Sequence, residues 1–199
     1  MLVLASASPR RQDLLRNAGI SFTLQPAHID ETPLPNEDPM ACVERLAREK
    51  ALAVWKTRQN HLVLGADTTV VVNEMMLAKP ADAEDAARML RLLSGRTHQV
   101  ITGVCLAGPP HGPTKKDDQR VENCALSTAS ETTLVTFLEL SDADLREYIA
   151  TGEPMDKAGA YAIQGIASRW IPRIEGDYSN VVGLPVALVY RMLRERDFL

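Results

Sequence analysis

The sequence predicts an α/β fold in which a mixed, twisted sheet is flanked by helices. Short apolar runs typical of buried strands intermix with segments whose apolar residues recur at helical spacing. Several of these helical segments follow a residue suited to capping a helix, such as Asp38 and Asp82. The chain has 199 residues, 45% of them hydrophobic, which is the size and composition of one folded domain.

The first residues predict a strand, a helix and a second strand. Leu2 to Ala5 is a short apolar run typical of a buried strand. Ser8 suits the N-cap of a helix, and Pro9 suits its first position, where the missing N–H costs nothing. Gly19 suits the end of this helix, and Phe22 to Gln25 is a candidate second strand.

The rest of the chain continues this pattern. The predicted elements are a helix capped by Asp38 and running to about Lys56, a strand over Leu62–Val72, a hairpin turn at Asn73–Glu74, a helix from Asp82 to about Leu93, strands over Val100–Ala107 and Glu131–Leu140, a helix from Ser141 to about Thr151, a strand over Trp170–Ile174 and a closing helix over Pro185–Arg196. The polar residues 108–128 are predicted to be a surface excursion of a single domain that spans residues 1–199.

Composition argues against several classes of protein. The net charge is −4, whereas a dedicated nucleic-acid-binding protein usually has a basic excess, so we expect no nucleic-acid partner. No apolar run approaches the roughly 20 residues of a membrane helix, and the apolar start lacks the basic segment of a signal peptide. The three cysteines are widely spaced without a CxxC motif, which is typical of reduced thiols. We therefore expect a cytoplasmic protein with no membrane partner.

A first candidate site lies where the first strand is predicted to meet the first helix. A helix N-terminus attracts anions, and Arg10 and Arg11 in its first turn oppose the helix dipole at a cost that a bound anion would relieve. Arginine is also suited to grip phosphate through two parallel hydrogen bonds. The segment from Ser6 to Arg11 is therefore a candidate phosphate site. The alternative is a solvated helix start.

Two charged residues fall where the pattern predicts burial. Lys50 lies in the middle of the apolar stripe of the second helix, and Asp67 lies inside the strand predicted over Leu62–Val72. A buried carboxylate is costly unless it is paired, hydrogen-bonded or bound to a metal. Asp67 could thus be a general base for water, a metal ligand, or both. The alternatives are a lysine whose stem covers apolar surface and a structural carboxylate that caps a turn.

Two weaker signals complete the set. Lys79 follows the predicted hairpin and adds a cation, and Asp30-Glu31 is an acidic turn whose oxygens suit Mg²⁺. Each alone is more often solvated surface. Together with the arginines, Lys50 and Asp67, they suit a polyphosphate ester with a divalent metal and a carboxylate that deprotonates the attacking water.

Eight short segments carry a resemblance to a known family. They are residues 4–11 (LASASPRR), 45–51 (RLAREKA), 65–68 (GADT), 79–80 (KP), 94–98 (SGRTH), 156–161 (DKAGAY), 163–165 (IQG) and 176–185 (GDYSNVVGLP). In this order, over nearly the whole chain, they resemble the Maf family of nucleoside triphosphate pyrophosphatases.

The resemblance implies an α/β fold with two lobes around a cleft, as in inosine triphosphate pyrophosphatases, and a homodimer. It also implies hydrolysis of a nucleoside triphosphate between the α and β phosphates, giving monophosphate and pyrophosphate with a divalent cation, Mg²⁺ or Mn²⁺. The roles it implies are the base for Asp67, phosphate binding for Ser8, Arg11, Lys50 and Lys79, and metal binding for Glu31 together with Asp67.

Three positions separate the substrate branches of this family. Here they are Arg10, Thr68 and Gln164, which resemble the branch that acts on dTTP, UTP and modified uridine triphosphates. A neutral Gln offers a donor and an acceptor to the imide edge of a pyrimidine, whereas the branch that acts on 7-methyl-GTP would be expected to carry Glu there. A 7-methyl-GTP pyrophosphatase is one alternative. A nucleotide-binding regulator of cell division (septum formation) that does not turn over its ligand is another.

Overall fold

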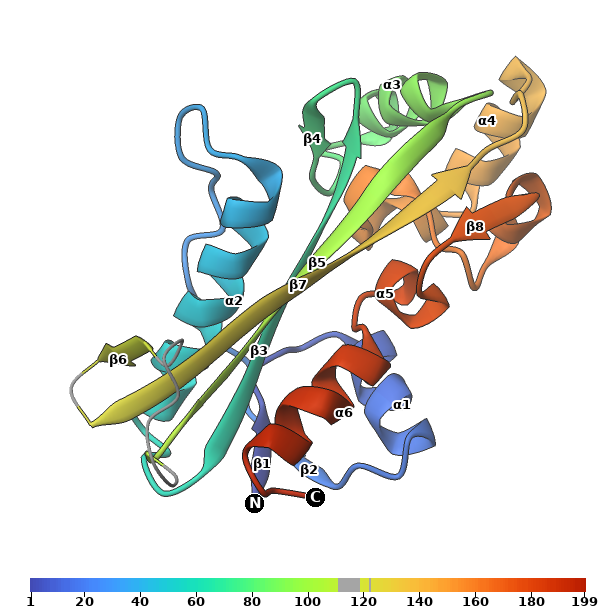
Figure 1. Ribbon diagram of the computed structural model, residues 1–199. Helices are drawn as coiled ribbons and strands as arrows, with labels where there is room; N and C mark the ends of the chain where they lie inside the picture. Colours follow the sequence, from blue (N-terminus) through green and yellow to red (C-terminus); the bar gives the residue numbers. More distant parts are fainter. Residues whose placement is uncertain (111–118, 122) are drawn as a thin grey trace. The chain divides into compact units, whose positions relative to one another are not determined.

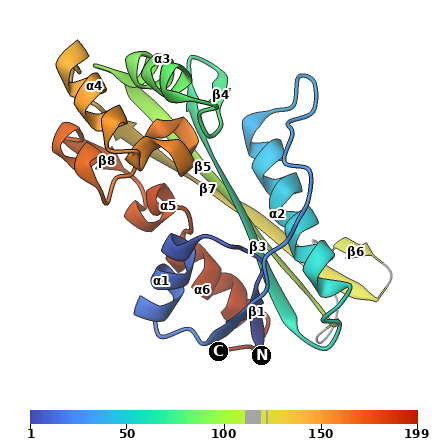
Figure 2. The same ribbon diagram turned by 180° about the vertical axis from the view of Figure 1, so that it is seen from behind.

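The α/β class predicted from the sequence is confirmed (Figures 1 and 2). The computed structural model describes residues 1–110, 119–121 and 123–199. Within these residues the strands are β1 (Leu2–Leu4), β2 (Phe22–Leu24), β3 (Leu62–Val72), β4 (Met75–Leu77), β5 (Thr97–Gly108), β6 (Gln119–Val121), β7 (Cys124–Thr136) and β8 (Arg173–Glu175). The helices are α1 (Pro9–Asn17), α2 (Pro39–Trp55), α3 (Ala83–Leu93), α4 (Asp142–Ala150), α5 (Tyr178–Val182) and α6 (Val186–Glu195), with short 3₁₀ helices at Glu153–Asp156, Ala158–Ala160 and Ile166–Trp170.

The strands form a mixed sheet, as predicted. The strand order through the described part of the chain is β2-β1-β3-β5-β7-β6, with β4 paired to β3 and β8 paired to β7. β1 runs parallel to both β2 and β3, so that Leu2 lies opposite Phe22 and Leu62. β4, β6 and β8 each pair antiparallel with their neighbours. Parallel strands need a crossover connection, and α1 and α2 supply the crossovers from β1 to β2 and from β2 to β3.

The chain divides into two compact units. Unit 1 comprises residues 1–67, 102–131 and 183–199, and unit 2 comprises residues 68–101 and 132–182. Three of the four divisions fall within β3, β5 and β7, each of which contributes residues to both units, and the fourth follows the end of α5 at Val182. On β3, Asp67 is the last residue of unit 1 and Thr68 is the first residue of unit 2.

In unit 1, helices cover both faces of the sheet. Leu2 and Leu4 of β1 belong to an apolar cluster with residues of α1 and α6. Val3, between them, belongs to a second cluster with residues of α2. Since successive side chains of a strand point to opposite faces, α2 covers one face and α1 and α6 cover the other, as Figures 1 and 2 show.

Two glycines allow α2 to pack directly on the strands. A Cβ atom at Gly65 of β3 would lie 2.1 Å from the carbonyl oxygen of Ala47 and 2.8 Å from the nitrogen of Ala51. A Cβ atom at Gly103 of β5 would lie 2.4 Å from the carbonyl oxygen of Val43. Only glycine allows two backbones to approach so closely. The α2 backbone is therefore fixed against β3 and β5.

Unit 2 has an aromatic core of its own. His98, Phe137 and Tyr161 contact one another edge to face, with ring centroids 4.8 to 5.4 Å apart. The Nε2 atom of His98 lies 2.8 Å from the hydroxyl oxygen of Tyr161, within hydrogen-bond distance. Burial lowers the pKa of His98 to about 4, so this ring is neutral at pH 7.

Helix starts and the first hairpin are confirmed as predicted. Ser8, Asp38, Asp82 and Ser141 each cap a helix by accepting a hydrogen bond from a backbone N–H of the first turn. The hairpin at Asn73–Glu74 joins β3 to β4, and both residues have positive φ angles, 48° and 65°. Such angles are typical of the two-residue turns whose twist matches the flanking strands.

The strand predicted to begin at Glu131 and to end at Leu140 is wrong at both ends. β7 begins at Cys124 and ends at Thr136. Its start is buried and pairs with β6, which the polar composition of this stretch does not reveal. Residues 108–128, the predicted surface excursion, thus include part of β7, while residues 111–118 and 122 lie outside the described residues.

The strand predicted over Trp170–Ile174 is also misplaced. Trp170 ends a 3₁₀ helix, and β8 covers Arg173–Glu175 instead. Pro172 has no N–H to donate to a ladder, which explains why pairing starts only after it. The short helix α5 was not predicted, because its five residues are too few to show a periodic pattern.

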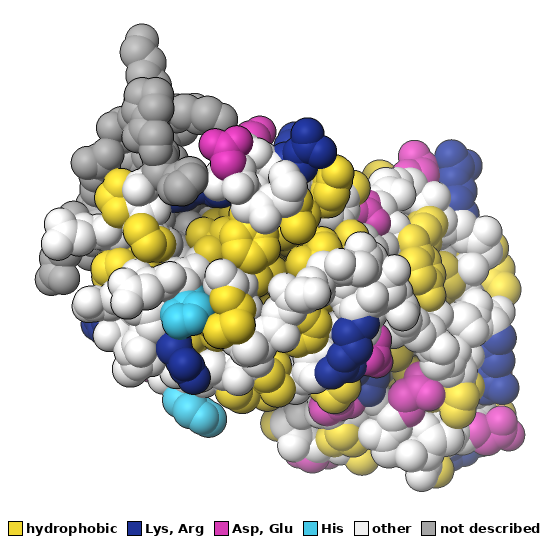
Figure 3. Space-filling model, turned by 90° about the horizontal axis from the view of Figure 1, so that it is seen from below, with side chains coloured by type: hydrophobic (Ala, Val, Ile, Leu, Met, Phe, Trp, Pro, Cys, Tyr) yellow, Lys and Arg dark blue, Asp and Glu magenta, His cyan; other side chains and the backbone are white. Residues whose placement is uncertain are grey.

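The surface carries charges of both signs. Figure 3 shows basic, acidic and hydrophobic side chains interspersed on one face of the molecule, among the residues that it colours. Of the helices in the described part of the chain, none is long and apolar enough to cross a membrane.

Candidate active site

One lysine in unit 1 joins two of the candidate carboxylates. The Nζ atom of Lys50 on α2 lies 2.6 Å from Oδ1 of Asp67 on β3 and 2.7 Å from Oε1 of Glu31 in the loop before α2. The Lys50 and Asp67 side chains are 9% and 14% exposed, whereas that of Glu31 is 51% exposed. The ammonium group therefore bridges a largely buried carboxylate and a half-exposed one.

The packing of α2 on β3 explains why Lys50 reaches Asp67. Lys50 directly precedes Ala51, one of the two α2 residues whose backbone lies against Gly65 of β3, and Asp67 lies two residues beyond that glycine. The lysine thus leaves the helix on the face that covers the strand. Its amine contacts two carboxylates, so Lys50 is more than a lysine whose stem covers apolar surface and whose amine lies in solvent.

Arg11 connects the start of α1 to the same position on β3. Its Nη1 atom donates to the carbonyl oxygen of Ala66 at 2.9 Å and to Oγ of Ser6 at 3.3 Å, and its Nε atom donates to the carbonyl oxygen of Gly183 at 2.7 Å. Burial lowers the pKa of Arg11, and the charge of Asp67 acts in the opposite direction. Because Ala66 directly precedes Asp67, the guanidinium lies in the same site as this carboxylate.

Two serines shape the turn between β1 and α1. The Oγ atom of Ser8 accepts a hydrogen bond from the backbone N–H of Arg11 at 3.5 Å, and the backbone N–H of Ser8 donates to Oγ of Ser6 at 3.2 Å. Ser6 is buried, and it belongs to the predicted phosphate segment from Ser6 to Arg11, although the sequence predicted no separate role for it. Arg10 lies in the first turn of α1 and is partly exposed.

Glu31 and Asp67 are chemically suited to share a divalent cation. Both contact the same Lys50 nitrogen, so the two carboxylate oxygens lie no further apart than the sum of those two contacts. Carboxylate oxygens are ligands that Mg²⁺ takes, at about 2.0–2.1 Å from the ion. Mg²⁺ usually combines one or two carboxylates with water and substrate phosphates. The described residues hold no group of three or more His, Cys, Asp or Glu arranged for a metal.

The other three candidate residues belong to unit 2. Thr68 is half-buried and follows Asp67 on β3. Lys79 is exposed and follows the hairpin of β3 and β4, and Gln164 is exposed in the turn before the 3₁₀ helix at Ile166–Trp170. The structure thus brings Glu31, Lys50, Asp67 and the Ser6–Arg11 turn together within one unit, and Lys79 and Gln164 lie in the other.

The turn that carries Gln164 is held from within unit 2 by a carboxylate that sequence reasoning missed. Glu153 Oε1 accepts hydrogen bonds from the hydroxyl of Tyr148 at 2.9 Å and from the backbone N–H of Ile166 at 3.1 Å. A Cβ atom at Gly165 would lie 2.1 Å from the same oxygen. The glycine after Gln164 therefore makes room for this carboxylate.

Comparisons with known proteins give the chain's family. The model of the Maf-like protein family matches residues 1–196. A relative from Koribacter versatilis (strain Ellin345) is 54% identical over 198 residues, which cover 100% of this chain and 95% of the relative. Relatives from Syntrophomonas wolfei subsp. wolfei and Shigella sonnei are 49% and 48% identical over 193 residues each, with 97% and 96% of this chain and 96% and 91% of the relative covered. All three are named dTTP/UTP pyrophosphatase. The chain belongs to the Maf-like protein family.

Proposed function

We propose that this chain is a nucleoside triphosphate pyrophosphatase that hydrolyses dTTP, UTP and modified uridine triphosphates to the monophosphate and pyrophosphate. The observation that carries the proposal is the contact of Lys50 with both Asp67 and Glu31, because it gathers a base, a cation and a second carboxylate at one point. Relatives of nearly the same length, 48% to 54% identical and named dTTP/UTP pyrophosphatase, support the reaction and the substrates.

Asp67 is the proposed general base. Its carboxylate takes a proton from water as the water oxygen adds to phosphorus and the bond between the α and β phosphates breaks. Pyrophosphate leaves with the bonding electrons, and the monophosphate keeps the new oxygen. Lys50 orients the carboxylate through the 2.6 Å contact and turns toward a phosphate oxygen when substrate enters.

A divalent cation, Mg²⁺ or Mn²⁺, is proposed to bind at Glu31 and Asp67. When bound, it offsets the negative charge of the phosphates near two carboxylates. The phosphate oxygens themselves are assigned to Ser8, Arg11, Lys50 and Lys79. The Arg11 guanidinium already lies beside Asp67 through its contact with Ala66, which supports its place in this set.

Arg10, Thr68 and Gln164 are proposed to select the base and sugar of the substrate. The amide of Gln164 both donates and accepts hydrogen bonds, which matches the imide edge of uracil and thymine. Gln164 is exposed, and its turn is held by Glu153, so the amide is presented on a fixed backbone.

We also propose that the protein acts in the cytoplasm as a homodimer that binds no nucleic acid. The three cysteines are buried free thiols, which supports a reducing compartment. The net charge of −4 gives no general attraction for a polyanion. The family resemblance supports the dimer.

The test is a panel of triphosphates with Mg²⁺ or Mn²⁺: dTTP, UTP, 5-methyl-UTP, 7-methyl-GTP, ATP, GTP and CTP, with all products identified. We expect monophosphate and pyrophosphate from dTTP, UTP and 5-methyl-UTP above all others. Preference for 7-methyl-GTP would contradict the proposed substrates. Tight binding of triphosphates without any product would contradict the enzyme and favour a nucleotide-binding regulator. Release of inorganic phosphate and a diphosphate would contradict the proposed bond.

A further inference from the structure

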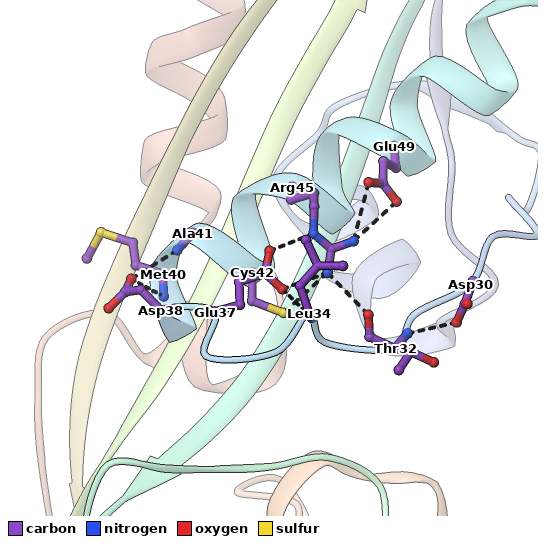
Figure 4. A network of polar contacts seen from close by, with 10 residues as sticks. All are labelled: Asp30, Thr32, Leu34, Glu37, Asp38, Met40, Ala41, Cys42, Arg45 and Glu49. Carbon is purple, nitrogen blue, oxygen red and sulfur yellow. Dashed lines mark hydrogen bonds and ion pairs between the residues drawn. The ribbon is translucent and has the colours of Figure 1, made fainter.

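The loop between β2 and α2 carries Glu31 on a backbone that belongs to no helix or strand. The Glu31 side chain is 51% exposed, so packing does not fix it in place. The position of its carboxylate therefore depends on how the loop itself is held. Figure 4 shows that the side chain of Arg45, from α2, reaches across to this loop.

Arg45 holds the loop by donating two parallel hydrogen bonds to the carboxylate of Glu37. Its Nε atom donates to Oε1 of Glu37 at 2.6 Å, and its Nη2 atom donates to Oε2 at 2.7 Å. The two side chains are only 15% and 9% exposed. Oε2 of Glu37 in turn accepts a hydrogen bond from the backbone N–H of Leu34 at 2.9 Å. Paired hydrogen bonds fix an orientation as well as a distance, so the loop backbone is tied to α2.

The same guanidinium reaches the residue that follows Glu31. The Nη2 atom of Arg45 donates to the carbonyl oxygen of Thr32 at 3.3 Å, and the backbone N–H of Thr32 donates to Oδ1 of Asp30 at 2.9 Å (Figure 4). The residues on both sides of Glu31 are thereby linked to each other. The remaining nitrogen of Arg45, Nη1, lies 3.3 Å from Oε1 of Glu49 one turn along α2, which holds the guanidinium in place.

Charge keeps this contact formed at neutral pH. The hydrogen bonds that Arg45 donates to Glu37 lower the pKa of Glu37 to about 2, and the same hydrogen bonds raise the pKa of Arg45. Both groups are therefore ionised at neutral pH. None of the phosphate or metal roles proposed above uses either side chain.

We propose that Arg45 is a positioning residue for the divalent cation: by holding the loop it keeps Glu31 beside Lys50 and Asp67. The inference rests on the proposed metal site. Arg45 and Lys50 both project from α2. The helix therefore fixes the spacing between Arg45, which holds the loop, and Lys50, which contacts the Glu31 carboxylate. Loss of the Arg45 contact releases Glu31 without removing any proposed ligand.

The test measures Mn²⁺ binding rather than turnover. Full-length protein saturated with α,β-methylene-UTP, which lacks the hydrolysable bridge, is titrated with Mn²⁺, and unbound Mn²⁺ is followed by electron paramagnetic resonance. We expect Arg45→Met and Glu37→Gln each to raise the Kd for Mn²⁺ about 10- to 100-fold, as residues that orient metal ligands do. Glu31→Gln should raise the Kd for Mn²⁺ to a similar extent. In the double variant, Arg45→Met should leave the Kd at the value of Glu31→Gln alone.

Arg16→Met is the matched control. Arg16 forms an exposed ion pair with Asp13 on α1 at 2.7 Å, so this variant removes an arginine–carboxylate pair without touching the loop, and its Kd should equal that of the wild type. Arg45→Lys keeps the charge but not the paired hydrogen bonds, and it replaces Arg45→Met if that variant does not fold.

Three outcomes would overturn the inference. The first is an unchanged Kd for Mn²⁺ in the Arg45 and Glu37 variants. The second is that Arg45→Met weakens Mn²⁺ binding by the same factor with Glu31 present and with Glu31→Gln. The third is no Mn²⁺ binding by the wild type. The titration needs no catalysis. If the wild type binds Mn²⁺ yet releases no pyrophosphate from UTP, the proposed function fails while the result for Arg45 stands.

Discussion

At the residue scale, unit 1 supplies hydrogen-bond acceptors for the cations of the candidate site. The amine of Lys50 contacts the carboxylates of Asp67 and Glu31. The guanidinium of Arg11 donates hydrogen bonds to oxygens of Ser6, Ala66 and Gly183. An unpaired buried charge costs several kcal/mol, so such positions require partners nearby. The same cost allows charged residues within apolar patterns to be recognised from sequence as candidate site residues.

His98 gives a residue-scale prediction about acid stability. The unfolded chain protonates this histidine near pH 6.5, whereas burial lowers the pKa of the folded state to about 4. Between these values the unfolded state binds more protons. The free energy of unfolding therefore falls as the pH is lowered from 6.5 toward 4. His98 accounts for at most about 1.4 kcal/mol of this fall per pH unit. Above pH 6.5 the stabilisation that comes from keeping His98 neutral is fully present.

Urea unfolding of His98→Gln between pH 4 and pH 7.5 checks this expectation. The slope of stability against pH should be shallower than in the wild type across that interval. His28→Gln removes an exposed histidine and serves as the control, with an unchanged slope expected. An identical slope in all three proteins would show that His98 does not carry the effect.

The side chains of the site differ in how far sequence alone could identify them. Asp67 and Lys50 interrupt apolar patterns, so the residue pattern alone identifies each as a candidate. Glu31 lies in a polar turn and gained its role from the resemblance. The contact of Arg45 with Glu37 could not be predicted, because it depends on the path of a loop that has no periodic pattern.

At the element scale, local chemistry predicted where helices start better than where strands end. A cap acts within one turn, so Ser8 and Asp38 could be identified from their immediate neighbours. The start of β7 depends on pairing with β6 and on the burial of Cys124, and both are long-range effects. Close backbone approaches such as that of α2 at Gly65 likewise require the partner to be known.

The packing of α2 on β3 predicts that Gly65→Ala is costly. The new methyl group would overlap the carbonyl oxygen of Ala47, so the helix or the strand must move. We expect the free energy of unfolding in urea to fall by about 1–3 kcal/mol, as for overpacked cores. We also expect lower kcat for UTP, because the movement displaces Lys50 from Asp67.

Gly19→Ala is the comparison for this variant. Its Cβ atom would meet no atom within 4 Å, although Gly19 has a φ angle of +69°. Backbone strain should therefore lower stability by about 1 kcal/mol and leave kcat unchanged. Equal effects of the two substitutions on kcat would contradict the role given to α2.

At the scale of the whole molecule, the proposed chemistry is divided between two units. Unit 1 holds Asp67, Lys50, Glu31 and Arg11, which suit the triphosphate and its cation. Unit 2 holds Lys79 and the Gln164 turn, which Glu153 supports. The family match over residues 1–196 and the alignment with the relative from Koribacter versatilis both extend over the two units.

The proposed role of Asp67 in activating water is tested by the rate of pyrophosphate release from UTP by the wild type and by Asp67→Asn. Asparagine keeps the size of the side chain and an oxygen for Lys50, so the unfolding midpoint and the binding of α,β-methylene-UTP should be retained. The rate should fall at least about 100-fold, the usual contribution of a general base. A folded Asp67→Asn variant that releases pyrophosphate at the wild-type rate would show that Asp67 is not the general base.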